Sequence, residues 1–316
     1  MWDSAPVFAL PLLGCLVGIG LGYAARAGRF CTLGALERFW YGGDATGLRT
    51  WLLAAATAIA ATQALVLGGV LDLSASFYLT PNFSLLGAVA GGLAFGLGMA
   101  LVGTCGFGAL IRLGGGSLRS LVVILVLAVF ALAAQRGLIG QARIHLIEPL
   151  ALDLTPAPDQ SLGSILEATT GFDLRIAVAA LLPAGLLTWI FSDRQYLRKS
   201  GQIAVGVSIG LLVAAGWLVT GTLRELSMEL EPVQLESASF VAPFADTLMS
   251  LATMTGAAPD YGVGLVFGVL IGAALAARRR GELRWEACDD ARELKRHMAG
   301  AALMGAGGIF AMGCTI

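Results

Sequence analysis

Seven stretches of this chain are apolar over about 18 or more residues, the length at which a helix crosses the hydrocarbon core of a bilayer. An eighth stretch, residues 298–316, is also apolar but rich in glycine. With 57% hydrophobic and 13% charged residues, the sequence predicts an all-α polytopic membrane protein. The seven stretches cover residues 5–25, 51–71, 84–103, 118–138, 174–192, 201–220 and 261–277.

Basic residues predict the orientation of these helices, because Lys and Arg collect in loops that stay in the cytoplasm. Sixteen of the 20 follow the first, third, fifth and seventh stretches, so we expect the N-terminus outside a bacterial inner membrane. The opening residues MWDSAPVF lack the positive region of a signal peptide, so the first helix should be retained. The sixteen are Arg26, Arg29, Arg38, Arg49, Arg112, Arg119, Arg194, Arg198, Lys199, Arg278, Arg279, Arg280, Arg284, Arg292, Lys295 and Arg296.

The connecting segments predict little chemistry of their own. Two outer loops are long, 139–173 and 221–260, and we expect each to hold a short surface helix. The inner connector 281–297 has a helical pattern in which Glu293 and Arg296 pair. A net charge of −1 excludes the basic face that nucleic-acid binding needs. The two histidines fall in loops on opposite sides, so we expect no metal site and no cofactor.

Three of the five cysteines lie in apolar segments studded with glycine: Cys31 in GRFCTLGAL, Cys105 in GTCGFGAL and Cys314 in AMGCTI. Gly103 and Gly106 beside Cys105 would interrupt a helix at membrane depth, where irregular backbone is tolerated only if it is buried or lines a cavity. Interrupted helices direct N–H groups and positive dipole ends at anions. We therefore predict that these thiols line a path for an anion.

Other interpretations of these segments stay open. Glycines also let helices pack closely, and a free cysteine is commonly a small buried apolar residue, which is how we interpret Cys15. We expect Cys288 to be an exposed thiol. Because apolar surroundings disfavour a charged thiolate, we expect neutral thiols along the path, acting as weak S–H donors. Weak successive contacts suit a conduit that must bind and release.

A frame of glycine and cysteine recurs along the chain. Two pairs of segments match, and in both pairs five spans separate the copies, so the copies would cross the membrane in opposite directions. This predicts an inverted repeat within one transport domain, 1–316, with halves of about 1–173 and 174–316. The matches are Gly96, Gly98 and Cys105 with Gly305, Gly307 and Cys314, and Gly22, Gly28 and Cys31 with Gly210, Gly216 and Val219.

At GRFCTLGAL, FGLGMALVGTCGFGALIRLGGGSLRS and RWEACDDARELKRHMAGAALMGAGGIFAMGCTI the chain resembles the YeeE/YedE family of inner-membrane proteins. The resemblance covers nearly the whole chain and implies uptake of thiosulfate. It also implies an hourglass-shaped helical fold with short re-entrant helices and inverted halves. The family pattern continues as GCTIGQG into another helix, whereas this sequence ends at Ile316, so we expect that helix to be missing from the second half.

The resemblance also assigns a relay. It implies that thiosulfate passes between neutral thiols by hydrogen bonding, without covalent change, and that these thiols are Cys31, Cys105 and Cys314. Glu37 is the best placed carboxylate for proton coupling, although pairing with Arg29 or Arg38 is its expected role. Neighbours of the thiols are expected to help bind the substrate, namely Gly103, Thr104, Gly106, Gly313, Thr315 and Arg29.

Energetics leave the driving force open. Moving the two charges of thiosulfate against 100 mV costs roughly 4.6 kcal/mol, so uptake needs a gradient, ion coupling or consumption inside. The sequence has no Walker A motif, and the resemblance suggests a cytoplasmic sulfurtransferase as a partner, besides membrane lipid. The alternatives are transport of another sulfur or selenium ion, a membrane thiol sulfurtransferase that forms covalent intermediates, and a scaffold or sensor that transports nothing.

Overall fold

The computed structural model describes residues 5–80, 82–155, 157, 159–227, 233–253, 259–287 and 290–314. Within these residues the fold is helical, and the one sheet pairs β1 (Asn82–Phe83) with β2 (Leu152–Asp153) in antiparallel register. Six described segments are helical, apolar and long enough to cross a membrane. They confirm the predicted all-α polytopic class. These segments are Ala9–Gly42, Thr46–Leu67, Leu85–Gly114, Leu118–Arg136, Ser200–Arg224 and Tyr261–Arg279.

Each of the eight predicted apolar stretches coincides with one long helix. The fifth is shorter than predicted, since α9 has only 17 residues. The eighth is helical only as far as Phe310, in a helix that begins with charged residues. The helices are α1 (Ala5–Gly28), α3 (Thr46–Leu67), α4 (Leu85–Val102), α6 (Leu118–Arg136), α9 (Arg175–Phe191), α11 (Ser200–Ser227), α13 (Tyr261–Arg279) and α14 (Ala291–Phe310).

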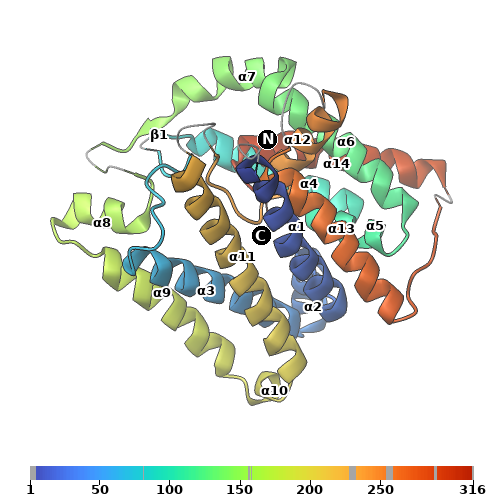
Figure 1. The fold of residues 1–316 in the computed structure, drawn as a ribbon, viewed down its shortest axis with the longest axis horizontal. Helices are drawn as coiled ribbons and strands as arrows, with labels where there is room; N and C mark the ends of the chain where they lie inside the picture. The colour runs from blue at the N-terminus through green and yellow to red at the C-terminus, as the bar shows by residue number, and fades with distance from the viewer. Residues whose placement is uncertain are drawn as a thin grey trace.

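Shorter helices join these long ones. In Figure 1, α7 and α12 lie toward the top of the molecule, and α10 lies at the bottom, between the end of α9 and the start of α11. The short elements are α2 (Thr32–Gly42), α5 (Gly106–Gly114), α7 (Leu138–Leu146), the 3-10 turn η1 (Glu148–Leu150), α8 (Leu162–Thr170), α10 (Arg194–Leu197) and α12 (Val241–Ala252).

Two predictions about the connecting segments need correction. The helix in the second outer loop, α12, is not a surface helix, because its Val241, Phe244 and Ala245 side chains are at most 2% exposed. Among the described residues of the inner connector, 281–287 and 290–297, only those from Ala291 onward are helical. Its first part is extended and runs beside the chain before α6, where Leu118 donates to the carbonyl of Glu286, and this pairing replaces the helical hydrogen bonds.

The closest helix pair of the fold is α1 against α13. Glycines on α13 lie where a Cβ atom would overlap carbonyl oxygens of α1: Gly264 against Pro11 and Gly268 against Cys15. Glycines on α1 do the same in return, as with Gly18 against the carbonyl of Leu265. Glycine at a spacing of four on both helices therefore lets the two backbones touch, which is how membrane helices associate without a hydrophobic driving force.

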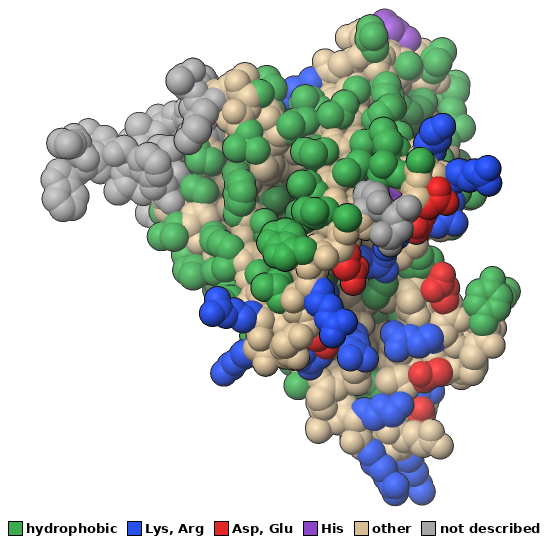
Figure 2. All heavy atoms as spheres, turned by 90° about the vertical axis from the view of Figure 1, so that its right-hand side faces the viewer, with side chains coloured by type: hydrophobic (Ala, Val, Ile, Leu, Met, Phe, Trp, Pro, Cys, Tyr) green, Lys and Arg blue, Asp and Glu red, His purple; other side chains and the backbone are tan. Residues whose placement is uncertain are grey.

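Charge is unevenly distributed over the molecule. Figure 2 shows hydrophobic side chains over the upper and middle parts of one face, while Lys and Arg gather over the lower part. Large apolar side chains point outward from the spanning helices, for example Leu93 (65% exposed) and Leu97 (62% exposed) on α4. Such a surface is stable in lipid and would aggregate in water.

The glycine contact makes a testable prediction. Gly268→Leu should force α1 and α13 apart and destabilise the protein by about 3 kcal/mol or more, because backbone atoms cannot yield to the new side chain. Gly92→Leu on α4 is the matched control, since nothing lies within 4 Å of a Cβ atom at that position. Monodisperse yield and melting temperature in detergent measure both effects. Equal behaviour of the two variants would contradict the packing described here.

Candidate functional site: thiols at helix interruptions

Two of the three predicted thiols begin short helices that follow an interrupted span. Cys31 is the N-cap of α2 and Cys105 is the N-cap of α5, both with extended backbone. The Sγ atom of Cys31 accepts from the N–H of Gly34 at 3.5 Å, and that of Cys105 accepts from the N–H of Gly108 at 3.4 Å. Each sulfur thus replaces the oxygen of a Ser or Asp cap, and each thiol has a fixed place at the positive end of a helix.

All three thiols share a second local feature. The residue two positions before each cysteine has left-handed backbone: Arg29 with φ 52°, Gly103 with φ 76° and Met312 with φ 56°. Arg29 and Met312 are the only non-glycine residues with positive φ in the described part of the chain. At the ends of α1 and α14, the N–H of the residue after the left-handed one donates to the carbonyl five residues earlier: Phe30 to Ala25, and Gly313 to Gly308. This is the hydrogen-bond pattern of a Schellman helix end. The three interruptions are therefore alike in backbone as well as in sequence.

Glycine is needed around Cys105 because the interruption is crowded. A Cβ atom on Gly108 would overlap the hydroxyl oxygen of Thr104. One on Gly106 would lie 3.2 Å from the ring of Phe244. The carbonyl that Gly103 exposes where α4 ends accepts from the Arg112 guanidinium at 2.8 Å. The sequence prediction that glycine at 103 and 106 interrupts the helix is thus confirmed.

Cys31 opens onto a cavity of about 500 Å³ near the ends of α1 and α4. Thr104 also lines it, and its hydroxyl is buried without a hydrogen-bond partner. Such a group costs about 1–3 kcal/mol unless a ligand or water satisfies it. The described charged groups of the lining are four guanidinium groups and one carboxylate, so the cavity attracts anions. These are Arg26, Arg29, Arg112, Arg284 and Glu282.

The pairing predicted for Glu37 is wrong. Arg29 lies 3.6 Å from Glu282, which also pairs with Arg26 at 3.3 Å. Arg38 instead donates to the carbonyl of Gly34 within its own helix. Glu282 follows α13, far along the chain, so its approach to α1 could not be read from local spacing.

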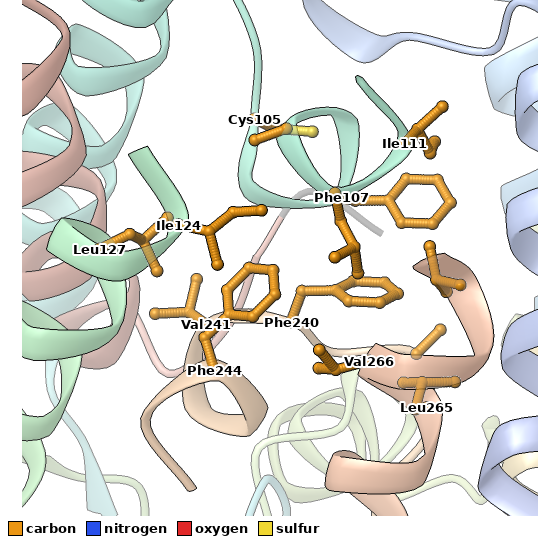
Figure 3. Packing of buried hydrophobic residues seen from close by; sticks show 14 of the residues in the cluster. Cys105, Phe107, Ile111, Ile124, Leu127, Phe240, Val241, Phe244, Leu265 and Val266 are labelled. Carbon is orange, nitrogen blue, oxygen red and sulfur yellow. The ribbon is translucent and has the colours of Figure 1, made fainter. Parts of the chain in front are cut away.

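Cys105 lies in the apolar core, 3% exposed. Figure 3 shows it at the start of α5, above a group of aromatic rings from α5 and the region of α12. The Phe107 and Phe240 ring centroids are 4.7 Å apart, and those of Phe240 and Phe244 are 6.3 Å apart. The same core cluster includes Ile111, which lines the Cys31 cavity, and Ala238, which lines the cavity beside Cys314. Cys105 therefore belongs to an apolar barrier between two cavities.

Cys314 lies at the other side of this barrier. It lines a cavity of about 270 Å³ together with Tyr78, Ser239 and Gly313, and it packs against the core cluster. Gly313, predicted as a binding residue, is thus beside the cavity, and no atom lies within 4 Å of a Cβ atom built on it. Thr315, the other predicted neighbour, lies outside the described residues.

Sequence reasoning missed a buried carboxylate beside this second cavity. Glu236 is 9% exposed and lines an adjoining cavity of about 250 Å³ together with Asp246. Burial, then the charges of Asp260 and Asp246, raise the pKa of Glu236 to about 8. Burial and Asp260 raise the pKa of Asp246 to about 6, against the lowering effect of Arg136. The only sequence signal was a glutamate in a serine-containing loop, LESASF, and nothing local indicates its burial.

Fold and site together define a multi-pass membrane protein with two cavities, of about 500 and 270 Å³, separated by an apolar, thiol-containing barrier, the arrangement of a transport protein. The chain belongs to the sulphur transport family, whose sequence profile matches residues 27–316. It is 26% identical to the thiosulfate transporter TsuA of Escherichia coli K12, over 98% of this chain and 86% of that protein. It is 24% identical to the thiosulfate transporter TsuA of Spirochaeta thermophila, over 96% of this chain and 88% of that protein.

The geometry predicts different reactivity for the thiols. In single-cysteine variants, Cys31 should react with a polar maleimide through the arginine-lined cavity, whereas Cys105 should react at least about tenfold more slowly because access to it needs an opening of the barrier. Rates of labelling in detergent, read by mass spectrometry, measure the difference. Equal rates would mean that Cys105 is not enclosed as described.

Proposed function

We propose that this protein takes up thiosulfate across a bacterial inner membrane, as a transporter and not as an enzyme. The observation that carries the proposal is the repeated interruption: three long helices, α1, α4 and α14, end in the same left-handed turn, and a cysteine follows each turn. Both relatives are thiosulfate transporters. The arginine-lined cavity beside Cys31 supports an anionic cargo.

The path runs from the Cys314 cavity, past Cys105 in the barrier, to the Cys31 cavity. Neutral thiols along it donate weak S–H hydrogen bonds to the terminal sulfur or oxygen atoms of the anion. Contacts of this strength hold the anion without trapping it, which a conduit requires. Thr104 adds a hydroxyl donor on the cavity side of Cys105.

The orientation belongs to the same proposal. The basic end of the molecule faces the cytoplasm, in accord with the bias of Lys and Arg toward that side, so α1 begins outside and the Cys31 cavity opens inside. Lys and Arg over the lower part of Figure 2 support this orientation. The arginines at the Cys31 cavity would then receive the anion at the end of its path.

An inverted repeat with halves of about 1–173 and 174–316 is also part of the proposal. It would exchange α1 with α11, α3 with α13 and α4 with α14. Helix contacts support this exchange, because α1 packs on α13 as α11 packs on α3. In addition, α1 contacts α11 and α4 contacts α14. These are contacts between the two copies of one repeated helix, as expected where the symmetry axis passes between them.

Consumption of the anion inside would drive inward flow against the membrane potential. A cytoplasmic sulfurtransferase is the class of partner that would consume it. Consumption would keep the thiosulfate concentration low at the arginine-lined cavity. The resulting concentration gradient across the membrane offsets the roughly 4.6 kcal/mol that two charges cost against a membrane potential of 100 mV.

The relay makes a direct prediction. Cys105→Ala should lower thiosulfate uptake into proteoliposomes by about tenfold or more, because the barrier loses its only described donor thiol, while stability falls only by the roughly 1 kcal/mol that the loss of one helix cap costs. Cys15→Ala is the matched control, since this free thiol lies on α1 away from the described cavities. Mass spectrometry of the protein after transport should find no sulfur adduct on any cysteine. A persulfide or mixed disulfide would instead indicate the alternative, a thiol sulfurtransferase.

Thr104 provides a second prediction. Thr104→Val keeps the shape of the side chain but removes the hydroxyl that lines the Cys31 cavity, so uptake should fall about threefold to tenfold. Thr104→Ser keeps the hydroxyl and should retain uptake near the original rate. If the valine variant transported as well as the serine variant, the hydroxyl would have no role in the path.

A further inference from the structure

The buried carboxylate Glu236 has no part in the proposed path through Cys314, Cys105 and Cys31. Its side chain lines the cavity of about 250 Å³ that adjoins the Cys314 cavity. The backbone N–H of Gly262, at the start of α13, donates a hydrogen bond to the Glu236 carboxylate. The backbone of Glu236 is held as well, because the Thr220 hydroxyl donates to its carbonyl at 2.8 Å. An acid that is only 9% exposed is costly unless hydrogen bonds or an opposite charge satisfy it.

A neighbouring phenol also lacks a partner. The Tyr261 hydroxyl is buried, in a residue 1% exposed, and makes no hydrogen bond. It lies close to the Glu236 segment, because a Cβ atom on Gly216 would lie 2.5 Å from both this hydroxyl and that of Ser237. Its phenol is also subject to the charge of Glu236. Tyr261 is not among the residues that line the Glu236 cavity or the Cys314 cavity, so it marks a second polar group that the fold leaves buried without a partner behind the site.

The acid and the outer thiol share one surface. Tyr78, Ser239 and Gly313 line both the Glu236 cavity and the Cys314 cavity. Burial raises the pKa of the Tyr78 phenol to about 12, and both Cys314 and Glu236 act on it in the same direction. An anion beside Cys314 would therefore lie within the electrostatic reach of Glu236.

Charged groups from several neighbouring elements surround the Glu236 side chain. Asp246 comes from α12, Asp260 precedes α13, and Arg143 comes from α7. Arg136 from α6 lies 3.7 Å from Asp246 and offsets part of that charge. Ionised Glu236 would add a further negative charge to this group, and would repel an anion in a cavity with little water to screen it.

We propose that the joined outer cavities are an anion-binding site in which Glu236 acts as a neutral carboxylic acid and donates its O–H to the incoming anion. This inference rests on the proposed uptake of thiosulfate and adds its proton linkage. The proton comes from outside water and stays on Glu236 while the anion is bound. Binding of the anion and of the proton therefore favour each other, and Arg143, whose guanidinium also pairs with Glu148 at 3.4 Å, supplies positive charge to the site.

The sign of the pH dependence follows from linkage. Because the site needs the protonated acid, affinity is full below the Glu236 pKa of about 8 and is lost as pH rises through it. Between pH 7 and pH 9 the neutral fraction of such a group falls by about tenfold. Asp246, with its pKa raised only to about 6, is already ionised over this range and does not contribute to the change.

The test uses purified full-length protein in proteoliposomes, with initial rates of thiosulfate uptake between external pH 6 and pH 9. The rate should fall about tenfold from pH 7 to pH 9, whereas Glu236→Gln should transport at the rate reached at pH 7 across the whole range. Glu167→Gln on α8, which removes an outer carboxylate that pairs with Arg175, should keep the original profile. A glutamine variant that is well folded but inactive at pH 7, or that keeps the original pH profile, would overturn the proposal.

A second measurement needs no variant. Thiosulfate added to the detergent-solubilised protein in weakly buffered solution should cause uptake of about three-quarters of a proton at pH 8.5, where an acid with a pKa of about 8 is already about one-quarter protonated, and almost none at pH 6, read with a pH dye. Binding at pH 8.5 without proton uptake would overturn the inference and leave thiosulfate transport standing. An absence of thiosulfate transport at every pH would instead contradict the proposed function itself.

Discussion

Every interruption of a helix at membrane depth must satisfy the backbone groups that it frees, because lipid supplies no hydrogen bonds. In this protein the interruptions after α1 and α4 are closed by a left-handed residue and then by a cysteine whose sulfur caps the next helix. The cap fixes each thiol at a positive helix end. One backbone feature thus satisfies the freed backbone groups and also places the thiols that we propose as donors along the path.

The rest of the fold keeps these interruptions in place. Glycines on α1 and α13 bring the two backbones into contact, and this pair carries both the Cys31 turn and the Glu282 carboxylate that pairs with Arg29. Around Cys105, the aromatic rings of Phe107, Phe240 and Phe244 fill the space between the cavities. Without this packing the Cys31 cavity and the Cys314 cavity would be connected, since a loosely packed barrier admits water and lets ions leak.

Much of this architecture could be predicted from sequence, and the exceptions have a common cause. Long apolar stretches identify spanning helices because length and hydropathy alone decide them, and glycine at 103 and 106 indicated where α4 ends. The burial of α12 was missed because Val241–Ala252 is too short to span and lies in a loop. Burial of Glu236 and the pairing of Arg29 depend on contacts between distant segments, which no local pattern encodes.

The central claim is that thiosulfate meets thiols without bonding to them covalently. The most direct test is a structure determined with the selenium analogue of the anion, in which the anomalous signal of selenium locates it. The account predicts selenium at hydrogen-bond distance from the sulfur of Cys314, Cys105 or Cys31, with no continuous density between the atoms. Selenium bonded covalently to a cysteine, or found only away from all three thiols, would contradict it.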